Sequence, residues 1–101
     1  MSDQGEADRR QSASGRRLRH ATGADLDALD EVLQALRGIP GLRERKRGSF
    51  SRGARALVHF HAGDGSFYAD VRLEERFERI SVTTAAERSA FLLRVRKALG
   101  E

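Results

Sequence analysis

The stretch LVHFHAGDGSFYADVRL, residues 57–73, constrains the fold more than any other part of the chain. Apolar and polar residues alternate on both sides of a glycine-rich centre. This period of two is typical of β-strands with one buried face, and the central glycines favour a tight turn between two such strands. The stretch therefore predicts an antiparallel hairpin.

A four-residue loop, 62–65, sets the expected register of this hairpin. It places His61 opposite Ser66 and His59 opposite Tyr68. Because side chains alternate across a strand, each strand then contributes to one apolar and one polar face. The predicted apolar face consists of Ala56, Val58, Phe60, Phe67, Ala69, Val71 and Leu73. The predicted polar face consists of Arg55, Leu57, His59, His61, Ser66, Tyr68, Asp70 and Arg72.

Helical periodicity flanks the hairpin on both sides. Apolar residues recur three or four positions apart within residues 24–37, and a second apolar stripe runs along 85–99. A threonine precedes each segment, and an acidic residue lies three positions after that threonine, which is the spacing of a capping box. The two pairs are Thr22 with Asp25 and Thr84 with Glu87. We expect Gly38 to end the first helix, because Pro40 prevents its continuation.

The remaining segments complete a two-layer fold. RFERISVTT, residues 76–84, alternates enough for a third strand, and a short extra strand near Phe50 remains an open alternative. The predicted fold class is α+β, with three or four antiparallel strands between two helices and both helices on one face of the sheet. We expect one domain, residues 22–101.

Residues 1–21 form the expected tail. They contain one large aliphatic residue, Leu18, and five arginines against three acidic residues. Such a segment buries too little apolar surface to offset its ordering entropy, so we predict a disordered basic tail. The chain has no cysteine, no apolar centre of a signal peptide and no apolar run of membrane-spanning length, so we expect a cytoplasmic protein without membrane contact.

The predicted polar face of the hairpin carries candidate ligand-binding residues. They are His59, His61, Tyr68, Asp70 and Arg72. Two histidines at i and i+2 project side by side from a strand, so His59 and His61 can reach one metal ion, with Asp70 as a third ligand or as the group that orients a ring. Histidine, tyrosine and aspartate also suit acid–base chemistry, but no activated nucleophile or phosphate-binding loop accompanies them. We assign no catalytic residue and expect no cofactor.

A basic segment, residues 43–55, precedes the hairpin. It has six basic residues and one glutamate, Glu44. The candidate nucleic-acid-binding residues are Arg43, Arg45, Lys46, Arg47, Arg52 and Arg55. Such a cluster attracts phosphates, and the net charge of +4 has the same sign. An alternative is that the cluster only offsets the acidic first helix within the molecule.

The hairpin resembles one found in small bacterial proteins of the luciferase-domain and YjbR-like type. The matching residues are His59, His61, Gly65, Asp70 and Leu73, over about 20 residues, together with the preceding helix and IPGL at 39–42. Those families continue with a helix and a tryptophan-containing strand, whereas this chain has no tryptophan and continues directly with FERISV. The resemblance implies a fold and no particular activity.

The sequence favours a small non-enzymatic binding module. Its expected partner is nucleic acid or an acidic protein, bound through residues 43–55 and the polar sheet face, and the same face can pair with a second copy. The alternative is a metal or small-molecule site around His59, His61, Tyr68 and Asp70, in which case the metal ligands are His59, His61 and Asp70.

Overall fold

The computed structural model describes residues 18–100, which form an α+β structure. The α+β fold class is thereby confirmed. The strands are β1 (Arg19–His20), β2 (Arg43–Lys46), β3 (Ser49–Arg52), β4 (Arg55–Gly63), β5 (Ser66–Val71) and β6 (Glu78–Ser81). The helices are α2 (Gly23–Ala28), α3 (Asp30–Arg37) and α4 (Ala85–Ala98). None of these helices has the length and apolarity of a bilayer-spanning segment.

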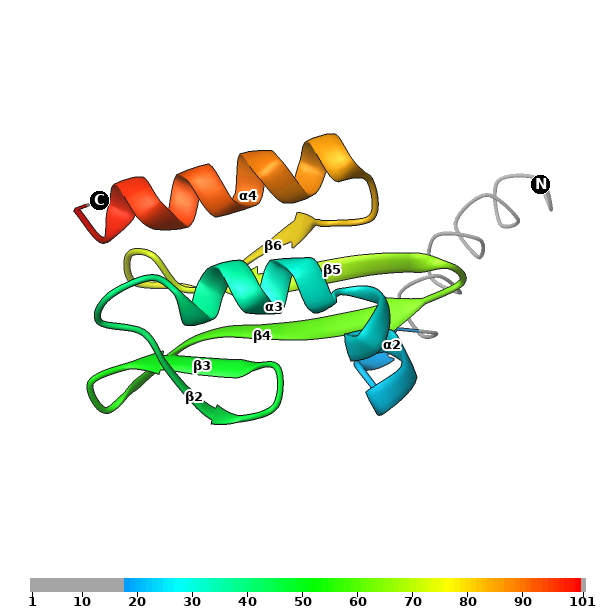
Figure 1. The fold of residues 1–101 in the computed structure, drawn as a ribbon, viewed down its shortest axis with the longest axis horizontal. Helices are drawn as coiled ribbons and strands as arrows, with labels where there is room; N and C mark the ends of the chain where they lie inside the picture. The colour runs from blue at the N-terminus through cyan, green and yellow to red at the C-terminus, as the bar shows by residue number, and fades with distance from the viewer. Residues whose placement is uncertain (1–17, 101) are drawn as a thin grey trace, which may run out of the picture.

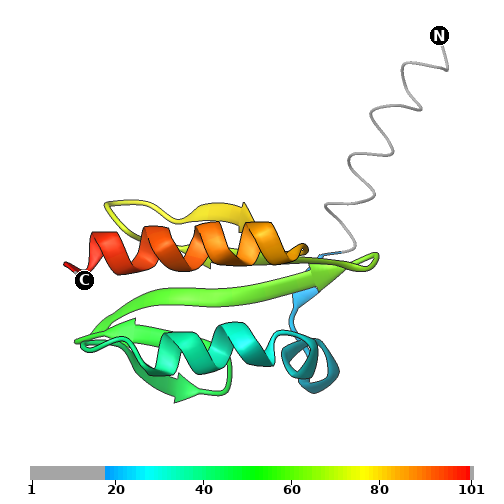
Figure 2. The same ribbon diagram turned by 45° about the horizontal axis from the view of Figure 1, so that its top comes forward.

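All strand pairs in this part of the chain are antiparallel. The sheet has the order β2-β3-β4-β5-β6, and β1 pairs with β4 outside this path. The long strands β4 and β5 run through the centre of the sheet, and α3 and α4 run along them (Figures 1 and 2). Phe50 lies in a strand, β3, and a further strand, β2, pairs with β3 at the edge of the sheet. The extra strand that the sequence left open is therefore present.

The central hairpin is tighter than the sequence predicted. Gly63 pairs with Ser66, so the turn has only two residues, Asp64 and Gly65. Both have positive φ, 53° and 78°, as in the type I′ turn whose twist matches that of the flanking strands. The predicted four-residue loop is therefore wrong, and the register moves by two residues. An even shift of register by itself moves no side chain to the other face of the sheet.

A β-bulge explains a second error, at the start of β4. Phe50 pairs with Val58 and Ser51 pairs with Ala56, which leaves Leu57 as an extra residue. A bulge turns neighbouring side chains toward the same side. Leu57 and Val58 are consequently both buried, whereas Ala56 is exposed. Strict alternation predicted Ala56 on the apolar face and Leu57 on the polar face. The bulge interrupts the alternation, so the prediction for these two residues is wrong.

The predicted first helix, 24–37, is divided at Leu29. This residue has φ −101° and ψ 14°, outside helical values, and it is completely buried. The Thr22–Asp25 capping box is confirmed at the start of α2, and Gly38 ends α3 as predicted. The break lets the short helix α2 direct Leu26 against Gly48 while α3 continues along the sheet.

The last helix follows its prediction closely. It begins after Thr84, whose hydroxyl accepts a hydrogen bond from the Glu87 backbone N–H at 3.1 Å. The Glu87 carboxylate in turn accepts from the Thr84 N–H at 3.0 Å, which completes the predicted capping box. Two further donors from the preceding turn reach the same carboxylate oxygen, the Ser81 hydroxyl and the Thr83 N–H. This network fixes where α4 leaves β6.

One hydrophobic cluster joins the helices to the sheet. Its largest fully buried members are Phe50, Phe91, Leu29, Leu33, Leu36, Val32, Val58, Val71, Val82 and Val95. The rings of Phe60 on β4 and Phe91 on α4 meet edge to face, with centroids 6.3 Å apart. Burial of these apolar side chains supplies the main stabilisation of the fold, at about 1.5–3 kcal/mol each.

The N-terminal boundary differs from the sequence prediction. Most of the predicted tail, residues 1–17, lies outside the described residues, but residues 18–21 belong to the fold. The Arg19 guanidinium donates to the Ala62 carbonyl at 3.0 Å and pairs with Asp25 at 3.1 Å. The Ala21 N–H donates to the Phe60 carbonyl at 3.0 Å. Backbone pairing and the side chain of Arg19 attach this segment, together with Ala21, which packs against the core. The polar composition of the tail does not reveal these contacts.

Candidate functional site: a histidine–aspartate cluster

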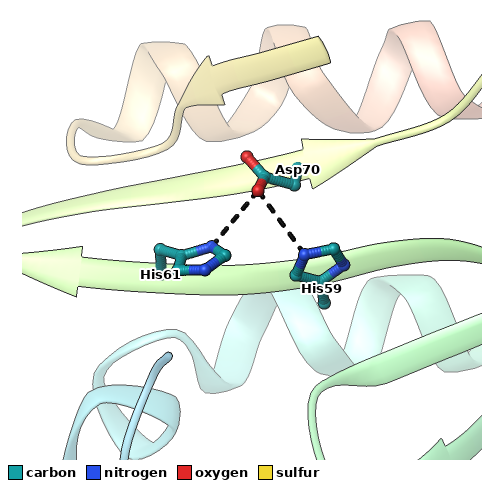
Figure 3. Close-up of side chains that lie close together, drawn as sticks. All are labelled: His59, His61 and Asp70. Atoms are coloured by element: carbon teal, nitrogen blue, oxygen red, sulfur yellow. Dashed lines mark ion pairs between the residues drawn. The ribbon is translucent and has the colours of Figure 1, made fainter. Parts of the chain in front are cut away.

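The strands β4 and β5 bring two imidazoles and one carboxylate together. Alternation along β4 places His59 and His61 on the same face, and the observed register puts Asp70 directly opposite His59. The nitrogen Nε2 of His59 lies 3.5 Å from Oδ2 of Asp70, and Nδ1 of His61 lies 3.3 Å from the same oxygen. Figure 3 shows both rings directed at this carboxylate. The structure thus unites three of the predicted site residues.

Arg79 on β6 holds the carboxylate from the other side. It pairs with Asp70 in the register of β5 and β6, and its Nε and Nη2 donate to Oδ1 and Oδ2 at 2.8 and 2.9 Å. Two parallel hydrogen bonds of this kind fix both the position and the plane of a carboxylate. The Arg79 guanidinium also holds the pKa of the Asp70 carboxyl below its usual range, against the opposing effect of burial.

The surroundings of both imidazoles favour their neutral form. Burial lowers the pKa of His59 and of His61, and the nearby Asp70 carboxylate offsets this only in part. The positive charge of Arg79 lowers both further. Because a metal binds the unprotonated nitrogen, neutral imidazoles are suited to act as ligands at neutral pH.

One nitrogen of the cluster is buried without a hydrogen bond. Nδ1 of His61 is inaccessible to solvent, and no partner with hydrogen-bonding geometry lies near it within residues 18–100. Its 3.3 Å approach to Asp70 is short enough but misaligned for a hydrogen bond. A buried polar atom left without a partner is destabilising by about 1–3 kcal/mol. This nitrogen is therefore the most unusual atom of the cluster.

A third imidazole lies beside the other two. His20 of β1 pairs with His61 in the sheet, and their ring centroids are 4.6 Å apart. His20 falls within the predicted tail, residues 1–21, and was not among the predicted site residues, because a two-residue strand has no detectable periodicity. On the other side of the cluster, the ring of Phe77 meets that of His59 edge to face at 5.2 Å.

The other two predicted ligand-binding residues are placed differently. Tyr68 lies opposite His61 on β5 and next to Ser81 on β6. Arg72 turns toward the loop after β5, where it donates to the Glu75 carbonyl and lies over the ring of Phe77. Arg79 takes the role of the cationic partner of Asp70. Arg79 was not among the predicted site residues, although the alternation of Ile80 and Val82 with their neighbours is a signal that could have placed it on this face.

The basic segment divides into paired and unpaired residues. Arg47 binds Asp27 at 2.7 Å, and Glu44 binds Arg37 at 2.6 Å, so part of its charge is used within the molecule. The remaining candidates are exposed, and no ion pair to them is found in the described part of the chain. They are Arg43, Arg45, Lys46, Arg52 and Arg55.

A pocket connects the basic segment to the histidine cluster. Its volume is about 420 Å³, and its lining includes Arg45, Lys46, Ser51, His20 and His59. The Ser51 hydroxyl is buried and, within residues 18–100, has no hydrogen-bond partner. The two candidate sites of the sequence analysis thus adjoin each other on the sheet.

No family model matches this chain, and neither a curated protein nor a solved structure shows significant similarity to it. The resemblance of the hairpin to the luciferase-domain and YjbR-like proteins stays a prediction. The case for function therefore depends on the geometry of the cluster itself.

Proposed function

We propose that this protein binds a divalent transition metal, with Zn²⁺ as the best fit. Each of His59, His61 and Asp70 offers one donor atom within 4.8 Å of the other two. The proposed ligand atoms are Nε2 of His59, Nδ1 of His61 and Oδ2 of Asp70, because both nitrogens approach this oxygen. The observation that carries the proposal is the buried, unpartnered Nδ1 of His61. A metal ion gives this atom the partner that it lacks.

The spacing of the donor atoms supports a tetrahedral site. Zinc–ligand bonds of about 2.0–2.1 Å with tetrahedral angles put neighbouring ligand atoms about 3.4 Å apart. The two nitrogen–oxygen distances in the cluster are 3.3 and 3.5 Å. An ordinary histidine–carboxylate hydrogen bond is shorter and better aligned, at about 2.7–3.2 Å. Both nitrogen–oxygen distances therefore fit ligands of one metal ion better than hydrogen-bonded pairs.

Arg79 is compatible with a metal at this position. A carboxylate oxygen has two lone pairs, so Oδ2 of Asp70 can accept a hydrogen bond from Arg79 and bind a cation at the same time. The bound cation is closer to the carboxylate than to the guanidinium, and the attraction therefore exceeds the repulsion. The bidentate contact acts as a support that fixes the ligand's orientation.

We further infer that both long helices cover the sheet face that carries Val58 and Phe60. Side chains of α3 and α4 share one hydrophobic cluster with these two residues, which supports this arrangement. The opposite face, with His59 and His61, is then left for a ligand.

The test is thermal unfolding of the full chain with and without Zn²⁺. A ligand at about 100 times its Kd stabilises the folded state by about 2.7 kcal/mol, which raises Tm measurably. We expect such a rise in the wild type and its loss in the double variant His59→Ala/His61→Ala and in Asp70→Asn. Glu31→Gln, which removes an exposed carboxylate of α3, is the matched control and should keep the rise. No shift in the wild type at saturating Zn²⁺ contradicts the proposal.

A second candidate function is binding of nucleic acid through the basic segment. It is supported by the exposure of Arg43, Arg45 and Lys46 and by the lack of an ion pair to them within residues 18–100. Binding of this kind weakens steeply as salt rises, because each neutralised phosphate releases counterions. We expect Arg45→Glu/Lys46→Glu to abolish it, whereas Arg76→Glu/Lys97→Glu, the same charge change at exposed positions elsewhere, leaves most of it. Salt-independent binding, or none to mixed DNA and RNA, contradicts this candidate.

A further inference from the structure

The short strand β1 brings a third imidazole to the metal cluster proposed above. Its two residues pair with the end of β4, Arg19 with Ala62 and His20 with His61. Directly opposed residues of antiparallel strands direct their side chains to the same face. His20 therefore lies on the face of His59 and His61, although it is 39 or more positions away in the sequence.

We propose that His20 is the fourth ligand of the metal, so that the bound ion ties the strand β1 to β4. This inference rests on the proposed function, because it assigns a further ligand to the same site.

The positions of the three rings support this assignment. Imidazoles bound to one tetrahedral Zn²⁺ have ring centres roughly 5 Å apart, given nitrogen–metal bonds of about 2.0–2.1 Å. The centroids of His59 and His61 are 5.2 Å apart. Those of His20 lie 4.6 Å from His61 and 6.1 Å from His59. The His59–His61 and His20–His61 distances lie close to the expected separation, whereas the His20–His59 distance is longer. The rings of His20 are tilted against the other two rather than stacked in parallel.

His20 has the freedom to complete the site. The compact donor set consists of His59, His61 and Asp70, so a nitrogen of His20 reaches the fourth position only after rotation of its side chain. The residue is exposed, and the 420 Å³ pocket lined by His20 and His59 leaves room for this rotation. The required change is thus in side-chain torsions, with the backbone of β1 already in place.

Four protein ligands define the type of site. Zinc sites with three histidines and one carboxylate from the protein leave no coordination position for water or substrate, as in sites that stabilise structure. The metal then joins residue 20 to the hairpin and closes a loop that contains α2, α3, β2 and β3. Apart from side-chain contacts of Arg19, a few backbone bonds hold β1, among them that from the Ala21 N–H to the Phe60 carbonyl.

The test compares the wild type with His20→Phe, which keeps a ring at this position but removes the donor atoms. We expect the variant to bind Zn²⁺ roughly 10²-fold more weakly, as for the loss of one of four ligands. In hydrogen exchange, Zn²⁺ should slow exchange of the Ala21 amide in the wild type and leave it unchanged in His20→Phe. His20→Gln is the second variant, with a polar side chain of similar reach, and should behave as His20→Phe does.

The outcomes separate this inference from the proposed function. If the wild type binds no Zn²⁺, the proposed function fails and this inference with it. A second outcome is that the wild type binds Zn²⁺ and His59→Ala does not, while His20→Phe and His20→Gln keep full affinity. If metal also leaves Ala21 exchange unaffected, only the role of His20 is overturned. Weaker binding in both variants together with loss of Ala21 protection supports it.

Discussion

Arg79 offers a test of the cluster that needs no metal. The side chain of its partner, Asp70, is 12% exposed, and its own is 46% exposed. Arg79→Gln removes the guanidinium and leaves the carboxylate facing two imidazoles that burial and Arg79 hold neutral in the wild type. We expect the free energy of unfolding to fall.

The expected loss lies between two limits. Pairs on the surface contribute about 0.2–1 kcal/mol, whereas removal of one partner of a buried pair is destabilising by about 3–5 kcal/mol. Because nearly half of the Arg79 side chain is exposed to solvent, screening brings the estimate for Arg79→Gln to about 1–2 kcal/mol. That is a substantial part of the roughly 5–15 kcal/mol typical of a domain.

The assay is urea unfolding with a chelator present, at pH 8, which lies well above the lowered pKa values of His59 and His61. The chain offers a matched control in Arg94, which forms the same type of bidentate contact with Glu78 but between two exposed side chains, 49% and 52%. Arg94→Gln should leave the unfolding midpoint unchanged within error. Equal midpoints for Arg79→Gln and the wild type would refute the reasoning, since Asp70 would then gain nothing from its partner.

The same variant has a defined pH dependence. Arg79 lowers the pKa of Asp70 in the folded state, so the pair's contribution is complete above the unfolded value of about 3.9. It is lost as the pH falls through the lowered folded pKa, because the carboxyl is then protonated in both states. The stability curves of Arg79→Gln and the wild type should therefore separate above about pH 4 and converge below it. Curves that stay parallel throughout the acid range contradict the assignment.

Three further predictions concern the fold that positions the site. Gly65→Ala should destabilise by about 1 kcal/mol in urea unfolding, because φ is +78° while nothing lies within 4 Å of the added Cβ; an unchanged midpoint argues against the type I′ turn. Thr84→Ala should destabilise by about 1 kcal/mol through loss of the cap of α4, with reduced helicity by circular dichroism, and full helicity contradicts the capping role. Phe91→Ala should destabilise by about 3–5 kcal/mol, because this ring is completely buried, and a Tm within a few degrees of wild type removes its assignment to the core.

The sequence predicted the elements that periodicity encodes. Strict alternation identified β4 and β5 and placed His59, His61 and Asp70 on one face. Helical spacing with two capping boxes located α4 and the segment that forms α2 and α3, but not the break between these two helices. These patterns are visible because one face of each element is buried in a common core. For the same reason the sequence could predict which face of the hairpin carries His59, His61 and Asp70, although it could not predict the register of the two strands.

The errors arose where backbone geometry departs from regular periodicity. The Asp64–Gly65 turn decided the register, and the bulge at Leu57 exchanged the faces of two residues. Neither departure is marked by hydrophobic pattern alone. The strand β1 was missed because backbone pairing and an Arg19 contact attach it, and the role of His20 was missed with it.

The most direct test of the metal site is X-ray absorption at the zinc edge on the Zn²⁺-loaded full chain. We expect one zinc per chain with four nitrogen or oxygen donors at about 2.0–2.1 Å and the scattering signature of at least two imidazoles. The double variant His59→Ala/His61→Ala should retain no zinc. A wild-type zinc surrounded only by oxygen donors, or a chain that keeps no zinc after desalting, would contradict it.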